Sequence, residues 1–264
     1  MRILFLAHRL PYPPNKGDKI RSFWELKTLS AQHEVDLFCF YDDPADEEHV
    51  STVSRYCRTC YAEKLSVMGS RLRALGGAAV GKPFSLGFFH SPQMAGRIRE
   101  AVSNRKYDLV FAYSSPMAQY LTGISALPRI LDMVDVDSLK WEQYAERAAW
   151  PYSWLWRREA RNLAEFEKQV VQEFSLTLVC TEAEAESLRR MKTAGEVAAL
   201  SHPLDLDYFD PEQTPLPAEI AALRPYLVFT GSMDYYPNVD GVLHFYRQVF
   251  PWLRAQIPSL RFVI

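Results

Sequence analysis

Two carboxylates and a lysine follow one of the apolar runs of this sequence. Asp135 and Asp137 are two residues apart just past residues 129–134, and Lys140 comes three residues later. A carboxylate in this position could accept a hydrogen bond from a ligand hydroxyl or stabilise a cation that develops in a transition state. The alternative is structural, because Asp137 or Ser138 could simply cap the next helix. The functional reading is favoured for Asp135 and the capping reading for Asp137.

A second candidate site follows the first apolar run, residues 3–7. Gly17 is predicted to allow a tight backbone turn, and Asp18 can cap a helix whose first turn carries Lys19 and Arg21. Free N–H groups at a helix N-terminus, together with two cations, would bind an anion. An ordinary strand-to-helix connection with a solvated basic first turn is the alternative. Neither GxGxxG nor GxxxxGK[ST] follows the run, so a simple dinucleotide-binding fold or a P-loop NTPase is not expected.

The composition restricts the class of protein. The chain has 264 residues, of which 48% are hydrophobic and 23% charged, and this balance is typical of a soluble globular protein. Its net charge of -2 does not suggest a nucleic-acid partner. No apolar run reaches the roughly 18 residues of a membrane span, and His8 and Arg9 interrupt the first run too early for a signal peptide. A cytoplasmic location is expected.

The four cysteines do not predict a metal site. Cys57 and Cys60 form a lone CxxC pair, whereas a structural zinc ion needs two further ligands that no second CxxC or HxxxH supplies. Cys39 and Cys180 lie in apolar runs and are predicted to be small core residues.

Apolar runs and helical segments alternate along the chain. This alternation predicts an α/β fold with a mostly parallel, doubly wound sheet. Residues 66–90 are expected to form a helix followed by a loop. In such sheets ligands bind at the carboxyl ends of the strands. The loops 10–21, 114–117 and 135–140 each follow a predicted strand, so they are expected to lie together at this edge of the sheet. The middle loop adds Ser114 and Ser115 as candidates. The predicted strands span residues 3–7, 34–40, 60–65, 108–113, 129–134, 176–180 and 196–200.

A domain boundary is expected after residue 202. Prolines crowd residues 203–225, which suggests a linker. A new strand at 226–230, a helix at 237–255 and a strand at 260–264 then form a single βαβ repeat. One repeat cannot cover both faces of a sheet. We therefore expect an N-terminal Rossmann-like domain (1–202), a linker (203–225) and the truncated start of a second Rossmann-like domain (226–264).

Several motifs, in order, resemble family-four glycosyltransferases of the GT-B fold, and most of all the sugar transferases of PEP-CTERM/exosortase exopolysaccharide systems. The motifs are ILFLAHRLPYPPNKGDKIRSFWELKTLSAQHEVDLFCF, LDMVDVDSLKWEQYA, LTLVCTEAEAESL, HPLDLDYFDP and FTGSMDYYPNVDGVLHF. The resemblance implies that the N-terminal domain binds a glycan or lipid-linked acceptor and the C-terminal domain a nucleotide-sugar donor. It implies a retaining, metal-independent hexosyl transfer without a cofactor.

The resemblance also assigns residues. Gly17 matches the glycine loop near the donor diphosphate, Gly231 and Ser232 match the glycine turn beneath it, and Asp135 falls where relatives carry a histidine near the reacting sugar. Relatives often continue with Gly-Arg-Leu and a lysine, whereas this chain has Ser232 and, near the lysine position, Asn238. Donor charge would then be neutralised elsewhere, for which Lys19 and Arg21 are the candidates.

Two other functions stay open at this point. A nucleotide-sugar epimerase shares the GT-B fold, and a non-catalytic sugar-binding domain could also keep it. The paired glutamates of the family are absent from this chain, and the 264 residues alone are expected to be inactive. Peripheral membrane contact is a further hypothesis, with tryptophans near arginines at the interface. These residues are Trp141, Trp150, Trp154 and Trp156 with Arg147, Arg157, Arg158 and Arg161.

Overall fold

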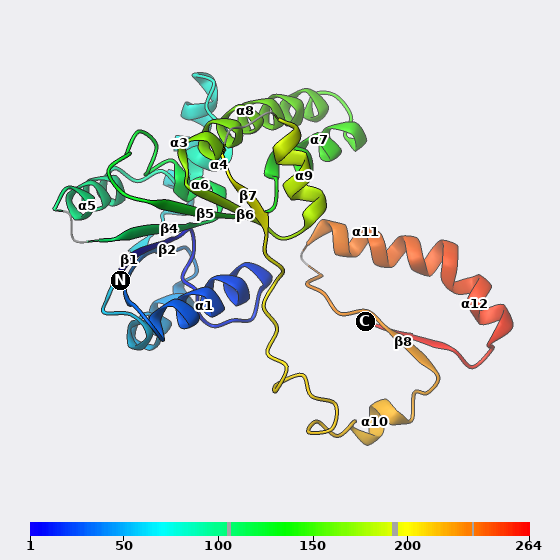
Figure 1. The fold of residues 1–264 in the computed structure, drawn as a ribbon. Helices are drawn as coiled ribbons and strands as arrows, with labels where there is room; N and C mark the ends of the chain where they lie inside the picture. The colour runs from blue at the N-terminus through cyan, green and yellow to red at the C-terminus, as the bar shows by residue number, and fades with distance from the viewer. Residues whose placement is uncertain (105–106, 192–194, 234) are drawn as a thin grey trace. The chain divides into compact units, whose positions relative to one another are not determined.

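The structure is a computed structural model that describes residues 1–104, 107–191, 195–233 and 235–264. The chain divides into unit 1, Met1–Pro203, and unit 2, Leu204–Ile264. In the described part of unit 1, seven parallel strands form one sheet in the order β3-β2-β1-β4-β5-β6-β7 (Figure 1). Its strands are β1 (Arg2–Ala7), β2 (Glu34–Tyr41), β3 (Thr59–Lys64), β4 (Leu109–Tyr113), β5 (Arg129–Val134), β6 (Leu176–Val179) and β7 (Val197–Ala199).

The strand order reverses beside β1. The chain runs outward from β1 to β2 and β3, then returns to pair β4 with the other side of β1. At the carboxyl end of the sheet, Ala7 of β1 lies opposite Cys39 of β2 and Tyr113 of β4. This topology confirms the predicted doubly wound parallel sheet. It also creates the switch point at which such folds bind ligands.

Helices cover both faces of the sheet. Helix α1 (Gly17–Ser30) lies on one side, and α5 (Pro92–Ser103), α8 (Tyr152–Glu173) and α9 (Glu182–Arg190) lie on the other (Figure 1). The remaining helical segments of unit 1 are η1 (Pro44–His49), α2 (Val50–Val53), η2 (Ser54–Tyr56), α3 (Val67–Ala79), α4 (Phe84–Phe88), α6 (Ser115–Ala118) and α7 (Asp137–Arg147).

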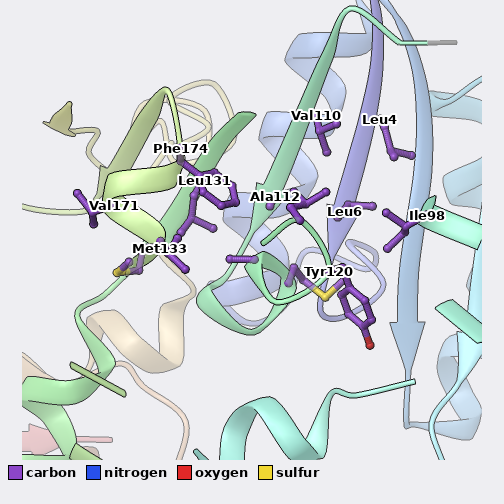
Figure 2. Packing of buried hydrophobic residues seen from close by; sticks show 14 of the residues in the cluster. Leu4, Leu6, Ile98, Val110, Ala112, Tyr120, Leu131, Met133, Val171 and Phe174 are labelled. Atoms are coloured by element: carbon purple, nitrogen blue, oxygen red, sulfur yellow. The ribbon is translucent and has the colours of Figure 1, made fainter. Parts of the chain in front are cut away.

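Strand β1 is buried on both faces because its side chains alternate between two cores. Leu4 and Leu6 pack with residues of α5 and α8 in one core, whereas Phe5 packs with α1 in the other. Figure 2 shows the first core, in which Leu4 and Leu6 lie near Ile98 and Leu131 near Phe174. In the second core, Phe5 stacks on Phe111 at 5.2 Å between ring centroids.

The segment 66–90 differs from its prediction. It forms two helices, α3 and α4, instead of a helix and a loop. The helices approach closely because Gly87 of α4 has no side chain, and a Cβ there would lie 2.7 Å from the Ala74 Cα of α3. Ser91 caps the start of α5, since its hydroxyl accepts a hydrogen bond from the Met94 N–H. Among the described residues, no helix combines the length and apolarity needed to cross a bilayer.

Unit 2 contains a β-α-β arrangement. Strands β8 (Tyr226–Val228) and β9 (Arg261–Val263) pair in parallel. The predicted helix 237–255 is interrupted, since a π-turn, η3 (Phe245–Val249), separates α11 (Tyr236–His244) from α12 (Phe250–Gln256). Pro251 explains the interruption, because proline cannot donate to the preceding helical turn. A short helix, α10 (Ala218–Ala221), precedes β8.

Candidate functional site

A pocket of about 300 Å³ lies at the carboxyl ends of β1, β4 and β5, beside the switch point of the sheet. All three loops expected to gather at this edge contribute to its lining, with Asp18, Ser114 and Asp135. The other lining residues come from the same strand ends, from α4 and from the start of α7. They include His8, Arg9, Ser85, Phe89, Tyr113, Val134, Asp137, Lys140 and Trp141.

Asp135 reaches the pocket through a tight turn centred on Val134. The Asp135 N–H donates to the Met133 carbonyl, 3.0 Å away, and Val134 has a φ of +72°. A β-branched residue in this region is strained, and its surroundings must enforce the conformation. The Asp132 carboxylate does so by accepting a 3.0 Å hydrogen bond from the Val134 N–H.

A second strained residue lies on the neighbouring strand end. Ser114 has a φ of +76°, and its N–H donates to the Asp132 carbonyl at 2.7 Å. Left-handed backbone at a non-glycine residue tends to occur at functional sites. Here both such residues line one pocket, which makes the carboxyl edge of β4 and β5 the strongest candidate site in unit 1.

The two aspartates of this loop have different surroundings. Asp137 accepts hydrogen bonds from Lys140 Nζ at 2.6 Å and from the Ser115 hydroxyl at 3.4 Å. Asp135 lies exposed at the rim, where partial desolvation and the nearby Glu184 carboxylate raise its pKa above the ordinary value. Asp137 is therefore held by protein groups, whereas Asp135 faces the opening.

The predicted capping role of Asp137 or Ser138 is wrong, because no side chain at the start of α7 caps the helix. Instead, the buried Glu167 carboxyl group on α8 accepts hydrogen bonds from the Ser138 N–H at 3.1 Å and from the Ser138 hydroxyl. Burial raises the pKa of Glu167 to about 7. Glu167 thus accepts a hydrogen bond from a backbone N–H at the start of α7, whereas Asp137 bonds to Lys140 and Ser115 at the pocket.

His8 and Arg9 line the pocket although the sequence analysis did not select them. His8 Nε2 lies 3.6 Å from Asp18 Oδ2, and Arg9 Nη1 donates to the same oxygen at 3.0 Å. Although burial opposes it, the nearby His8 and Arg9 side chains hold the pKa of Asp18 well below its usual range. The signal for both residues was their place directly after an apolar strand.

The His8 ring is fixed by aromatic neighbours. It stacks on Tyr113 at 5.7 Å between ring centroids and meets the edge of Phe89 at 5.3 Å. Among the described residues, its Nδ1 has no hydrogen-bond partner. If Nε2 carries the proton toward Asp18, Nδ1 holds a lone pair. His8 therefore combines a fixed orientation with an uncommitted nitrogen.

The predicted cations of the first helix have protein partners. Lys19 Nζ donates to Asp46 Oδ1 at 2.6 Å, and Arg21 Nε donates to Asp132 Oδ2 at 2.5 Å. All four side chains are buried, so the solvated basic turn is also not observed. Gly17 begins α1 without a left-handed φ, and a Cβ there would meet no atom within 4 Å. The turn requirement predicted for Gly17 is therefore absent.

A buried polar cluster lies between α1 and the sheet. Glu25 of α1 lies 3.3 Å from Arg21 Nε, and burial together with the nearby Asp132 carboxylate raises the pKa of Glu25 well above its usual value. Burial likewise raises the pKa of Tyr113, whose ring lines the pocket. Burial thus favours the protonated form of Glu25, which lies beside the Arg21–Asp132 ion pair.

The remaining predicted residues lie in unit 2. Asn238 Nδ2 donates to the Ser232 carbonyl at 2.9 Å. A Cβ at Gly231 would lie 2.9 Å from Asn238 Nδ2 and from Phe229 Cε1, so these side chains would have to shift to accommodate it. The structure thus brings the three residues together, with Gly231 and Ser232 in the turn after β8 and Asn238 in the first turn of α11.

The cysteines are free thiols. Cys39 is buried as predicted, but Cys180 is only partly buried and its sulfur lies 3.2 Å from His202 Nε2. Cys180 follows β6 and does not belong to it, which explains its exposure. In the described part of the chain, no group of three or more His, Cys, Asp or Glu side chains is arranged to hold a metal ion.

Comparisons with known proteins identify the fold. No protein-family model matches the sequence, and no curated protein matches it. Sucrose-phosphate synthase from Thermosynechococcus elongatus is structurally similar, with a TM-score of 0.57, 16% identity and coverage of 100% of this chain and 70% of that one. A Listeria monocytogenes protein designated a UDP-N-acetylglucosamine 2-epimerase has a TM-score of 0.50 and 10% identity, covering 99% of this chain and 61% of that one. The fold is therefore the Rossmann-like α/β fold of the GT-B glycosyltransferases.

Proposed function

We propose that this chain serves in the transfer of a sugar from a nucleotide-sugar donor to a hydroxyl group of a glycan or lipid-linked acceptor. Exopolysaccharide synthesis is the proposed setting, with retention at the anomeric carbon and without a metal ion. The observation that carries the proposal is the pocket at the switch point, which Asp135 and His8 both line from the carboxyl ends of β5 and β1. The GT-B fold supports it.

Asp135 is the proposed catalytic residue. As a carboxylate at the pocket rim, it would stabilise positive charge that develops on the sugar ring as the donor bond breaks. The leaving diphosphate would accept the proton of the acceptor hydroxyl. Ser114, Ser115, Asp137 and Lys140 would form the acceptor side, with Ser115 acting through its hydrogen bond to Asp137.

The donor side is proposed to involve the turn of unit 2. The N–H groups around Gly231 and Ser232 would donate hydrogen bonds to a diphosphate, and Asn238 would hold the turn in shape through its hydrogen bond to the Ser232 carbonyl. Lys19 and Arg21 are buried in ion pairs, so we assign them a positioning role. Arg9 is 40% exposed and lines the pocket, which makes it the better candidate for contact with an anionic group.

The test is product analysis with a panel of nucleotide-sugars and sugar acceptors. The proposal expects nucleoside diphosphate release and a glycosylated product only when donor and acceptor are both present. An epimerase, favoured by the Listeria structure, would instead convert the donor sugar without an acceptor. Binding of the donor without turnover, by this chain and by any longer form that contains it, would identify a sugar-binding domain and overturn the proposal.

A further inference from the structure

Helix α3 buries small residues and exposes large apolar ones, whereas an ordinary amphipathic helix buries its large apolar side chains. Its buried residues are small, namely Ser70, Ala74 and Ala78. Ala74 meets Gly87 of α4 so closely that no Cβ would fit there. Because small residues line the buried face, the helix contributes little apolar area to the core of unit 1.

The large apolar side chains of α3 face outward. Met68, Leu72 and Leu75 are 68%, 64% and 62% exposed, and Val80 just beyond the helix is 74% exposed. The spacing i, i+4, i+7 places the first three on one stripe of the helix. We name these four residues the α3 stripe. A contiguous exposed apolar surface of this kind indicates an interaction site.

The side chains around the α3 stripe are positively charged, which favours a negatively charged partner. Residues 64–99 contain six Lys or Arg residues and no Asp or Glu. Arg71 and Lys82 are exposed beside the stripe. A cavity of about 970 Å³ behind α3 is lined by the cations Arg73, Lys82 and Arg99 and by one carboxylate, Glu165. Apolar side chains combined with cations suit the surface of a bilayer that contains anionic lipid.

An aromatic residue extends this surface. Arg158 of α8 donates to the Ala78 carbonyl at the end of α3. Trp154 lies one turn earlier on the same face of α8 and is 61% exposed. By contrast, Trp141 and Trp156 are partly buried and pack on each other at 4.8 Å between ring centroids. Of the four tryptophans expected at a membrane, Trp150 and Trp154 are therefore exposed, and the other two pack on each other.

We propose that α3 docks this chain on an anionic lipid bilayer. The α3 stripe would enter the boundary between headgroups and acyl chains, and Arg71 and Lys82 would lie at the level of the lipid phosphates. Figure 1 shows that α3 lies on the side of the sheet opposite α1. The proposal does not depend on the sugar-transfer activity, because its readout is binding alone.

The test is co-sedimentation of the 264-residue chain with vesicles of phosphatidylcholine alone or mixed with phosphatidylglycerol. We expect binding to the anionic vesicles, weakened by salt. Met68→Ser/Leu72→Ser/Leu75→Ser should reduce it about tenfold or more, and Arg71→Gln/Lys82→Gln roughly 10- to 30-fold. The matched control is Gly96→Ser on α5, which lies outside the α3 stripe and where an added Cβ meets no atom within 4 Å. This control should bind as the wild type does.

Each other outcome contradicts the proposal. Equal binding to neutral and anionic vesicles, or none to either, would show that the cations do not select lipid. Unchanged binding of the triple variant would place the membrane contact elsewhere, with the exposed Trp150 and Trp154 as the next candidates. Analytical ultracentrifugation could instead show that the wild type is a dimer and the triple variant alone is a monomer. The α3 stripe would then bind a second copy of the chain.

Discussion

Arg21 of α1 and Asp132 of β5 form an ion pair that is completely buried, with 2.5 Å between Nε and Oδ2. The guanidinium also donates to the Leu200 carbonyl at 2.8 Å. The other oxygen of the carboxylate accepts the Val134 N–H of the strained turn. One buried pair thus joins the first helix, a central strand and the end of unit 1, and it supports the turn that presents Asp135.

Removing one member of this pair should destabilise unit 1 strongly. In Arg21→Met the Asp132 carboxylate stays buried without its counter-charge, and we expect a loss of about 3–5 kcal/mol in the free energy of unfolding. Urea unfolding followed by circular dichroism measures it. Arg2→Met is the control, since the ion pair of Arg2 with Glu34 is about half exposed, and it should change stability by less than about 1 kcal/mol.

A double variant separates the charge from the packing. Arg21→Met/Asp132→Leu replaces the whole pair by apolar groups, and it should recover part of the stability lost in the single variant. Equal losses for the single and double variants would mean that the uncompensated charge is not the cause.

Asp135→Asn should lower turnover in the assay of the proposed function. If the carboxylate stabilises the reacting sugar, we expect at least about a tenfold fall in kcat with an unchanged melting temperature. Glu142→Gln, an exposed carboxylate on α7, is the matched control and should retain full activity. A variant of normal activity would remove Asp135 from the site. A fall in melting temperature without a kinetic loss would assign it a structural role.

Glu167 should make stability depend on pH. Its pKa is about 7 in the folded protein and near 4.5 in the unfolded chain, so the folded state holds this proton more tightly. The free energy of unfolding should therefore fall as pH rises from 4.5 to 7, by on the order of 3 kcal/mol for this group. Glu167→Gln cannot titrate, and its stability should fall less over that range. Parallel pH profiles for the variant and the wild type would contradict the assignment.

Gly87→Ala should disturb the contact between α3 and α4. The new methyl group would lie 2.7 Å from the Ala74 Cα, so the helices must separate. We expect a loss of about 1–3 kcal/mol from overpacking, measured by urea unfolding. Gly96→Ala on α5 is the control, because its Cβ would meet no atom within 4 Å. It should be neutral or slightly stabilising, and a similar loss in both variants would exclude overpacking as the reason.

Local patterns predicted most of the sheet and part of the site. The strands predicted from the apolar run ending at Ala7 and from Arg129–Val134 are both confirmed. Each could be predicted because its pattern is contained in a few consecutive residues. The edge of the sheet that gathers Ser114 and Asp135 followed from topology. The two strained residues there were not predictable, because the φ above zero at Val134 depends on the Asp132 carboxylate, which Arg21 holds from 111 residues away.

Long-range pairing explains the failures. Lys19 and Arg21 stand in a basic helix start that suggests a ligand, yet their partners are Asp46 and Asp132, 27 and 111 residues away. The capping of α7 by Glu167 is similar, because the acceptor lies on the next helix. A pattern in a single sequence identifies residues that are neighbours on the same helix or strand. It does not identify a hydrogen-bond or ion-pair partner that is distant in the sequence.

The Arg21 contacts also set an order for folding during synthesis. They span 111 and 179 residues of sequence, so a chain made from its N-terminus contains α1 long before Asp132 and Leu200 exist. Burying the guanidinium without those partners is very unfavourable, which keeps α1 undocked until most of unit 1 has left the ribosome. Until then the apolar face of β1 that α1 covers stays open to other chains. Unit 1 should therefore depend on chaperones while it is translated.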